Sequence, residues 1–239
     1  MEIPGIRKES IAGSGILCGA ADRHSHIIWG VDDGCPDSAE SLSALAFMES
    51  AGISDVWATP HINEYMPNTT EGLKKAFEAL RAAYTGPVRL HLAAEYMLDT
   101  LLLERMEKRD LLVMEGNILL VEASTWNPPV DLHGILKEIM SAGYRPLIAH
   151  PERYRYMQED DYASLVGCGA LLQLNLPSLT GFYGETAREK ASALLRKGMY
   201  SCAGSDCHRS ATVAEQYNAA VLKRGTVRLL GQLLKKNLT

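Results

Sequence analysis

The chain lacks the signatures of several large enzyme classes. Its 239 residues contain no Gly-x-Ser-x-Gly nucleophile elbow and no P-loop with its lysine. A dinucleotide-binding turn is also missing, because Gly13-Ser14-Gly15 is not followed by a third glycine at the required spacing. Thiol phosphatases need an arginine six positions after the catalytic cysteine, and none of the five cysteines has one. Hydrolysis by this chain would therefore need water activated by another group.

The cysteine content, charge and apolar runs indicate where the protein works. The five cysteines are odd in number and include no Cys-x-x-Cys pair, which favours free thiols in a reducing cytoplasm. The net charge of -5 argues against a nucleic-acid partner or a membrane surface. No apolar run reaches the ~18 residues that span a bilayer. We therefore expect a cytoplasmic protein with no membrane span. The sequence indicates no oligomeric state.

Strand-like and helix-like segments alternate along the chain. Repeated strand–helix units predict parallel strands covered by helices. The alternative to a barrel is an open, doubly wound sheet. Because metal-ligand residue types follow almost every predicted strand, we favour a closed ring, which brings all the strand ends to one mouth. The predicted strands cover 16–26, 55–59, 89–95, 118–122, 146–150, 171–176 and 200–205, and the predicted helices cover 38–51, 70–84, 100–108, 132–142, 160–166, 186–197, 213–222 and 227–234.

The predicted fold is thus α/β, a barrel of about seven βα units. Residues 1–239 form a single domain in this interpretation, because no linker, repeat array or low-complexity tract divides them. Residues 1–21 are a leader, and the first strand ends at a His-x-His motif.

Histidines and carboxylates gather at the ends of the predicted strands. His24 and His26 lie one residue apart in an extended segment, so both imidazoles point the same way and can hold one cation. Imidazole and carboxylate ligands without a thiolate suit manganese, iron or zinc. We predict a multinuclear metal hydrolase whose nine ligand positions hold two or three ions. These positions are His24, His26, Asp32 or Asp33, His61, Glu95, Glu122, His150, Asp206 and His208.

Two arginines next to these residues are candidates for phosphate binding. Arg153, three residues after His150, has the rigid fork of donors that matches phosphate oxygens, although a surface ion pair is the alternative. Arg209, beside His208, is a weaker second candidate. His61, His208 or water would protonate the leaving group. Further side chains that we expect near the mouth are Tyr65, Met66 and Pro67 as an apolar lip, and Gln173, Asn175 and Ser178.

Taken in chain order, the motifs resemble those of the PHP (polymerase and histidinol phosphatase) superfamily. Within it, Val31-Asp32-Asp33-Gly34 and His150-Pro151-Glu152-Arg153-Tyr154 are similar to motifs of the CpsB/YwqE-type tyrosine-protein phosphatases. The resemblance runs from about Asp22 to Arg209. The motifs that carry it are Asp-x-His-Ser-His, Asp-Asp-Gly, Ala-Thr-Pro-His, Ala-Glu-Tyr, Leu-Val-Glu, Ile-Ala-His-Pro-Glu-Arg-Tyr, Leu-Gln-Leu-Asn and Gly-Ser-Asp-Cys-His.

The resemblance implies a distorted, TIM-like barrel of the PHP type with parallel strands. It further implies a manganese cluster of up to three ions, held by the nine positions named above, with Asp33 preferred to Asp32. It also implies a protein-tyrosine phosphatase that acts on a bacterial tyrosine kinase controlling capsule or exopolysaccharide synthesis. Two departures are visible. Arg209 stands where the family often has asparagine, and a second phosphate-binding arginine has no secure match, for which Arg209 is a candidate substitute. The alternatives are a small-molecule phosphomonoesterase, such as a histidinol phosphatase, or a non-catalytic binding module stabilised by metal.

Overall fold

The strands of the described chain, residues 8–238 of this computed structural model, form two parallel sheets and one small antiparallel pair. The parallel sheets have the orders β10-β9-β8-β7-β6-β4 and β2-β3-β5. They belong to one distorted barrel, because β3 runs on into β4 and β5 into β6, each after a break of two residues. The bounds are β2 Ala21–Ser25, β3 Asp55–Ala58, β4 His61–Ile62, β5 Arg89–Leu92, β6 Glu95–Met97, β7 Ile118–Glu122, β8 Arg145–Ile148, β9 Leu171–Asn175 and β10 Cys202–Gly204.

The first and last strands of the barrel meet beside the His-x-His motif. A parallel bridge pairs Ser25 with Cys207. The Asp206 amide donates to the His24 carbonyl at 2.8 Å, and the His26 amide donates to the Cys207 carbonyl at 2.9 Å. Residues from opposite ends of the sequence therefore lie side by side at the mouth of the barrel.

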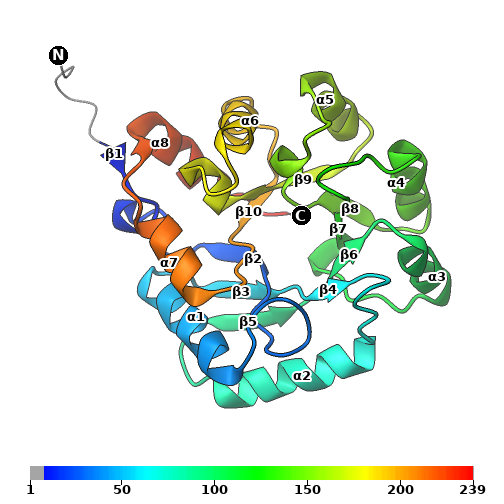
Figure 1. Ribbon diagram of the computed structural model, residues 1–239, viewed down its shortest axis with the longest axis horizontal. Coiled ribbons are helices and arrows are strands. Elements are labelled where there is room, and N and C mark those ends of the chain that lie inside the picture. Colours follow the sequence, from blue (N-terminus) through cyan, green and yellow to red (C-terminus); the bar gives the residue numbers. More distant parts are fainter. Residues whose placement is uncertain (1–7, 239) are drawn as a thin grey trace.

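Helices surround the strands, as Figure 1 shows. When β3 with β4 and β5 with β6 are each counted as one strand, every strand of the barrel is followed by one helix. This confirms the predicted seven βα units and the α/β class. Asp37, Thr69, Asp99 and Asp131 cap their helices by accepting a backbone N–H. The helices are α1 Ser38–Ser50, α2 Thr70–Ala83, α3 Thr100–Lys108, α4 Leu132–Ser141, α5 Glu159–Gly167, α6 Glu185–Arg196, α7 Ser210–Asn218 and α8 Arg224–Leu233. Within the described residues, no helix is long and apolar enough to cross a membrane.

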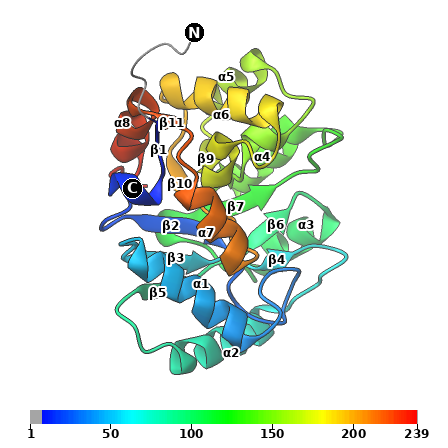
Figure 2. The same ribbon diagram turned by 60° about the vertical axis from the view of Figure 1, so that its left-hand side comes forward.

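The segment before β2 is part of the folded structure. The predicted strand over 16–20 is wrong, because the chain there forms η1 (Ala12–Ser14) and turns, with Gly15 and Gly19 at φ 74° and 73°. Strand β1 (Lys8–Glu9) pairs with β11 (Leu222–Lys223), next to α8 (Figure 2). Ile11 and Leu17 are fully buried. Residues 8–20 of the predicted leader thus pack on the barrel, and residues 1–7 lie outside the described residues.

Alternation along the strands separates an inner and an outer layer of apolar side chains. In β7, Ile118 and Leu120 belong to a cluster with Trp57 and Leu147, whereas Leu119 belongs to the larger cluster that includes the helix residues. Residues two apart share a face of a strand. Glu122 therefore continues the inner row of β7, and its carboxylate lies at the mouth above an apolar barrel interior.

Candidate metal centre

Five side chains form the most buried part of the mouth. Glu95 Oε2 lies 3.2 Å from His24 Nε2 and 3.4 Å from His26 Nε2. Asp206 Oδ1 faces the same two nitrogens at 3.5 and 3.4 Å, and His150 Nε2 lies 3.0 Å from Glu95 Oε1. None of the five residues is more than 6% exposed. Glu95 thus stands at the centre, between imidazoles from the ends of β2 and β8.

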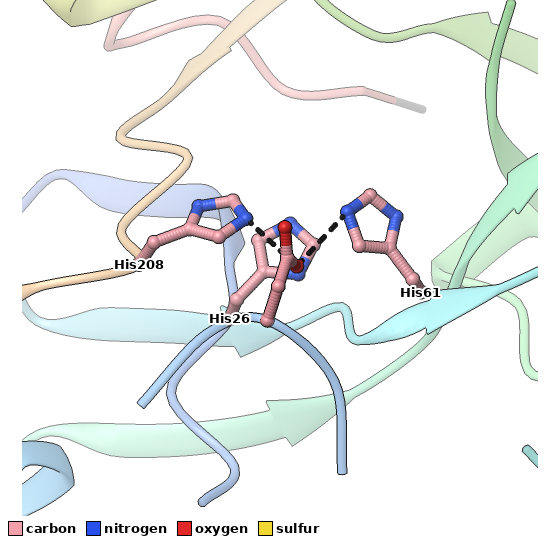
Figure 3. Close-up of side chains that lie close together, drawn as sticks. His26, His61 and His208 are labelled. Atoms are coloured by element: carbon pink, nitrogen blue, oxygen red, sulfur yellow. Dashed lines mark ion pairs between the residues drawn. The ribbon is translucent and has the colours of Figure 1, made fainter. Parts of the chain in front are cut away.

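Four more side chains continue the cluster toward solvent. His61 Nδ1 lies 3.1 Å from Glu122 Oε1 and 3.2 Å from Glu95 Oε2. The Asp33 Oδ1 atom lies 3.5 Å from His61 Nε2 and 3.3 Å from His208 Nε2. Figure 3 shows His61 and His208 approaching from opposite sides with His26 between them. All nine predicted positions therefore converge, in overlapping groups of three or four ligand atoms that lie within 4.8 Å of one another.

His150 and Asp206 reach the site from unusual backbone conformations. Their φ angles are 36° and 53°, in the left-handed region that residues with a Cβ rarely adopt. Such strained conformations cluster at functional sites, where the surrounding structure holds them.

Asp32 and Asp33 have different environments although they are adjacent. Asp32 Oδ2 accepts from His26 Nδ1 at 2.8 Å and from the His61 amide at 3.0 Å, and its Oδ1 accepts from the Gly34 amide at 2.9 Å. Asp33 faces only imidazoles, and its side chain is 64% exposed. Asp32 consequently orients His26 by holding its Nδ1 atom while Nε2 faces the cluster, and Asp33 is the carboxylate that itself faces the cluster.

Gln173 and Asp22 support the cluster from beneath. Gln173 Oε1 lies 3.2 Å from His24 Nδ1 and accepts from the His150 amide. Asp22 Oδ1 accepts from the Ser205 and His24 amides at 2.7 and 3.3 Å. Both residues are buried and neither lines the pocket, so Gln173 does not have the substrate-facing position that the sequence suggested.

The charges of the cluster fit bound cations. Burial disfavours the charged forms of these groups, but opposite charges outweigh it: the pKa of His24 is raised, and the pKa values of Glu95 and Asp206 lie well below their usual range. Against the same effect of burial, Glu95 and Glu122 raise the pKa of His61 to about 9. The carboxylates of the cluster thus favour positive charge on the groups between them, and positive charge is what a bound cation supplies.

Two buried atoms support the same conclusion. Among residues 8–238, Glu95 Oε2 and His61 Nδ1 have no hydrogen-bond partner, although they face each other and further ligand atoms. A buried polar atom without a partner is costly, and a metal ion would satisfy both atoms at once. The residues present thus fit a cluster of divalent cations.

Arg153 projects into the pocket above this cluster. The pocket has a volume of about 320 Å³. Arg153 lies in η3 (Pro151–Arg153), and its Nη1 donates to Asp206 Oδ2 at 2.7 Å. Its guanidinium lies 4.2 Å from the centre of the Tyr183 ring. The side chain is 25% exposed, so donors remain open to the pocket.

Arg209 lines the same pocket but is engaged with the backbone. Its Nη1 donates to the carbonyls of Asp33 and His208 at 3.0 and 2.6 Å, and to that of Gly34. The guanidinium therefore ties the segment after β10 to the Asp32–Gly34 loop, 175 residues away in sequence.

The sequence did not indicate two aromatic residues of the site, Phe182 and Tyr183. Both line the pocket, and the Tyr183 hydroxyl donates to Asp206 Oδ2 at 3.3 Å. The only sequence signal was the pair of glycines that flanks them. Conversely, Tyr65, which was predicted to form an apolar lip, does not line the pocket. This residue is 95% exposed. Ser178 is hydrogen-bonded to Glu152 away from the pocket.

Comparison with known proteins places the chain. The model of a family described as "Capsular polysaccharide synthesis, CpsB/CapC" matches residues 20–228, which include all nine clustered positions. The chain belongs to the CpsB/CapC family. The tyrosine-protein phosphatase YwqE of Bacillus subtilis (strain 168) is 28% identical over 198 residues, which cover 80% of this CpsB/CapC chain and 78% of YwqE.

Solved structures confirm the expected PHP-type fold of this CpsB/CapC member. One is a structure from a study of YwqE of Bacillus subtilis and CpsB of Streptococcus pneumoniae, described as metal-dependent tyrosine phosphatases. It has a TM-score of 0.76 at 24% identity and covers 92% of this chain and 96% of that chain. A histidinol phosphate phosphatase from Lactococcus lactis has a TM-score of 0.53 at 13% identity and covers 92% of this chain and 95% of that chain.

Proposed function

We propose that this chain is a metal-dependent protein-tyrosine phosphatase. The observation that carries the proposal is the convergence of nine imidazole and carboxylate side chains below Arg153, which lines the same pocket, in a member of the CpsB/CapC family. The relatives named in that family are tyrosine-protein phosphatases. The partner that we propose is a phosphotyrosine segment of a bacterial tyrosine kinase in capsule or exopolysaccharide synthesis.

The ions would be held by the nine positions with Asp33 in place of Asp32. Glu95, which faces four imidazoles, is suited to share its oxygens between two ions. Ligands of nitrogen and oxygen without sulfur favour manganese, with iron and zinc as alternatives. Two or three ions would balance five carboxylates, namely Asp32, Asp33, Glu95, Glu122 and Asp206.

The chemistry that bound divalent ions supply here is Lewis-acid charge for the phosphoryl oxygens and acidification of a water molecule. Arg153 binds the phosphate through guanidinium donors that Asp206 does not occupy. His61 and His208 are the partly exposed imidazoles at the mouth, so whichever of them does not bind an ion, or a water molecule, would protonate the departing phenolate. A phenol, with a pKa of about 10, leaves more easily than an aliphatic alcohol.

The three buried cysteines are unsuited to act as nucleophiles. Burial raises the pKa of Cys35 to about 11 and that of Cys202 to about 12. Burial also raises the pKa of Cys207, which directly follows Asp206, well above its usual range. These thiols stay protonated at neutral pH, and only a thiolate attacks phosphorus effectively.

Metal removal and substrate comparison test the proposal. Chelation should abolish hydrolysis of a phosphotyrosine peptide, and graded return of Mn²⁺ should restore it. Glu95→Gln should lose both bound metal and activity, whereas Glu138→Gln, at an exposed position of α4, is the matched control. Activity that survives exhaustive chelation would refute the proposal. Faster turnover of histidinol phosphate than of the peptide would favour the small-molecule alternative, and peptide binding without turnover would favour the binding module.

A further inference from the structure

We propose that Phe182 is the residue that selects aryl phosphates, by packing against the ring of the substrate. The inference rests on the proposed function, and it assigns to Phe182 the contact with the aromatic ring of the phosphotyrosine. Phe182 lines the pocket that also contains Arg153 and the metal-ligand side chains. With 48% of its surface exposed, it is one of few large apolar side chains of the described chain that remain open to solvent.

The loop between η4 (Leu176–Thr180) and α6 holds this ring in a defined place. Gly181 and Gly184 have φ angles of 93° and 91°, which residues with a Cβ rarely adopt. The Phe182 amide donates to the Pro177 carbonyl at 3.3 Å, and the Gly184 amide donates to the Gly181 carbonyl at 2.9 Å. Two successive tight turns therefore fix the backbone on both sides of Phe182.

Tyr183 links this loop to Arg153 and to Asp206. Its ring and the Phe182 ring are arranged edge to face with centroids 4.9 Å apart, and the Arg153 guanidinium lies over the Tyr183 ring, 4.2 Å from its centroid. The Tyr183 hydroxyl reaches Asp206. Phe182 is thus one aromatic ring away from the phosphate-binding arginine and from a ligand side chain, and its own ring offers only apolar surface.

The pocket lining has two chemical parts. Ionisable groups come from the barrel strand ends, whereas the apolar residues Pro177, Phe182 and Val213 come from the η4–α6 segment and from α7. A hydrogen bond from Thr180 to Gln216 joins these two segments at 2.6 Å. A substrate with a charged phosphate and a flat apolar ring matches this division, and aromatic pairs gain stability beyond the area that they bury.

Binding of two phosphonates tests the inference without depending on turnover. Phenylphosphonate and methylphosphonate carry the same anionic group and differ in the ring. With Mn²⁺-loaded protein in calorimetry, Phe182→Ala should weaken phenylphosphonate binding about fivefold and leave methylphosphonate binding unchanged. Phe182→Tyr keeps the ring and should bind both as the original protein does. Tyr65→Ala, which removes an exposed ring outside the pocket, is the matched control.

The outcomes separate this inference from the proposed function. If Phe182→Ala weakened the binding of both phosphonates equally, or left the binding of both unchanged, the inference would be overturned, even in a protein that hydrolyses phosphotyrosine. If the original protein fails to hydrolyse phosphotyrosine with any metal, the proposed function is wrong, while the phosphonate comparison still reports whether Phe182 reads a ring. Selective loss of phenylphosphonate binding supports the inference.

Discussion

The adjacent carboxylates Asp32 and Asp33 should respond oppositely to the same substitution. The Asp32 carboxylate accepts three hydrogen bonds, from His26, Gly34 and His61. In Asp32→Asn, one oxygen becomes an amide NH₂, so at least one of these buried donors loses its acceptor whichever way the amide is turned. Such a loss costs about 1–3 kcal/mol. The metal-free Asp32→Asn protein should be less stable by that amount.

Asp33→Asn should leave the metal-free protein nearly unchanged. The Asp33 side chain is 64% exposed and has ion pairs only with His61 and His208, and exposed substitutions usually change stability by less than about 0.5 kcal/mol. For metal binding we expect the larger, irreversible loss in Asp33→Asn and the smaller loss in Asp32→Asn. Asp33→Asn removes a proposed ligand and should lower the number of Mn²⁺ ions retained after dialysis, whereas Asp32→Asn should weaken affinity about 10- to 100-fold, so that excess Mn²⁺ restores occupancy.

Urea unfolding of the chelated proteins and elemental analysis after dialysis measure both effects. The conservative change keeps side-chain volume constant, so each variant controls for the other. If metal-free Asp33→Asn were the less stable variant and Asp32→Asn the one that loses an ion irrecoverably, the assignment of the two carboxylates would be reversed and the reasoning from hydrogen bonds refuted.

Three further changes probe other parts of the molecule. Arg153→Gln should lower kcat/KM for phosphotyrosine about 10- to 100-fold with Mn²⁺ content intact, because it removes charged donors to phosphate; parallel loss of metal would instead indicate a role through Asp206. Burial raises the pKa of Asp55, but the hydrogen bond from Arg89 outweighs it and brings the pKa to about 2. Asp55→Asn should therefore cost about 1 kcal/mol above pH 4, and the difference should disappear toward pH 2 in urea unfolding; a pH-independent difference would contradict the ion pair. Ile11→Ala should lower the free energy of unfolding by about 2–4 kcal/mol if residues 8–20 belong to the core, and no change would contradict their packing.

With Asp32 and Asp33 left as alternatives for one position, the sequence was enough for the fold class and for the other eight clustered positions. Both follow from periodic rules, because repeated strand–helix units give parallel strands, and the ends of parallel strands meet at one mouth. His24 and His26 illustrate this: their spacing of two residues places both imidazoles on one face of β2, and the structure brings both against Glu95.

Only the tertiary structure decided the functions of the residues in the loops. Which of Asp32 and Asp33 faces the cluster depends on how the chain turns after β2, where a Cβ at Gly34 would overlap the His26 carbonyl. Arg209 reaches the Asp33 carbonyl across 176 residues of sequence, and Phe182 enters the pocket because two glycines turn its loop. Such positions follow no period of two or 3.6 residues, since contacts between distant segments fix them.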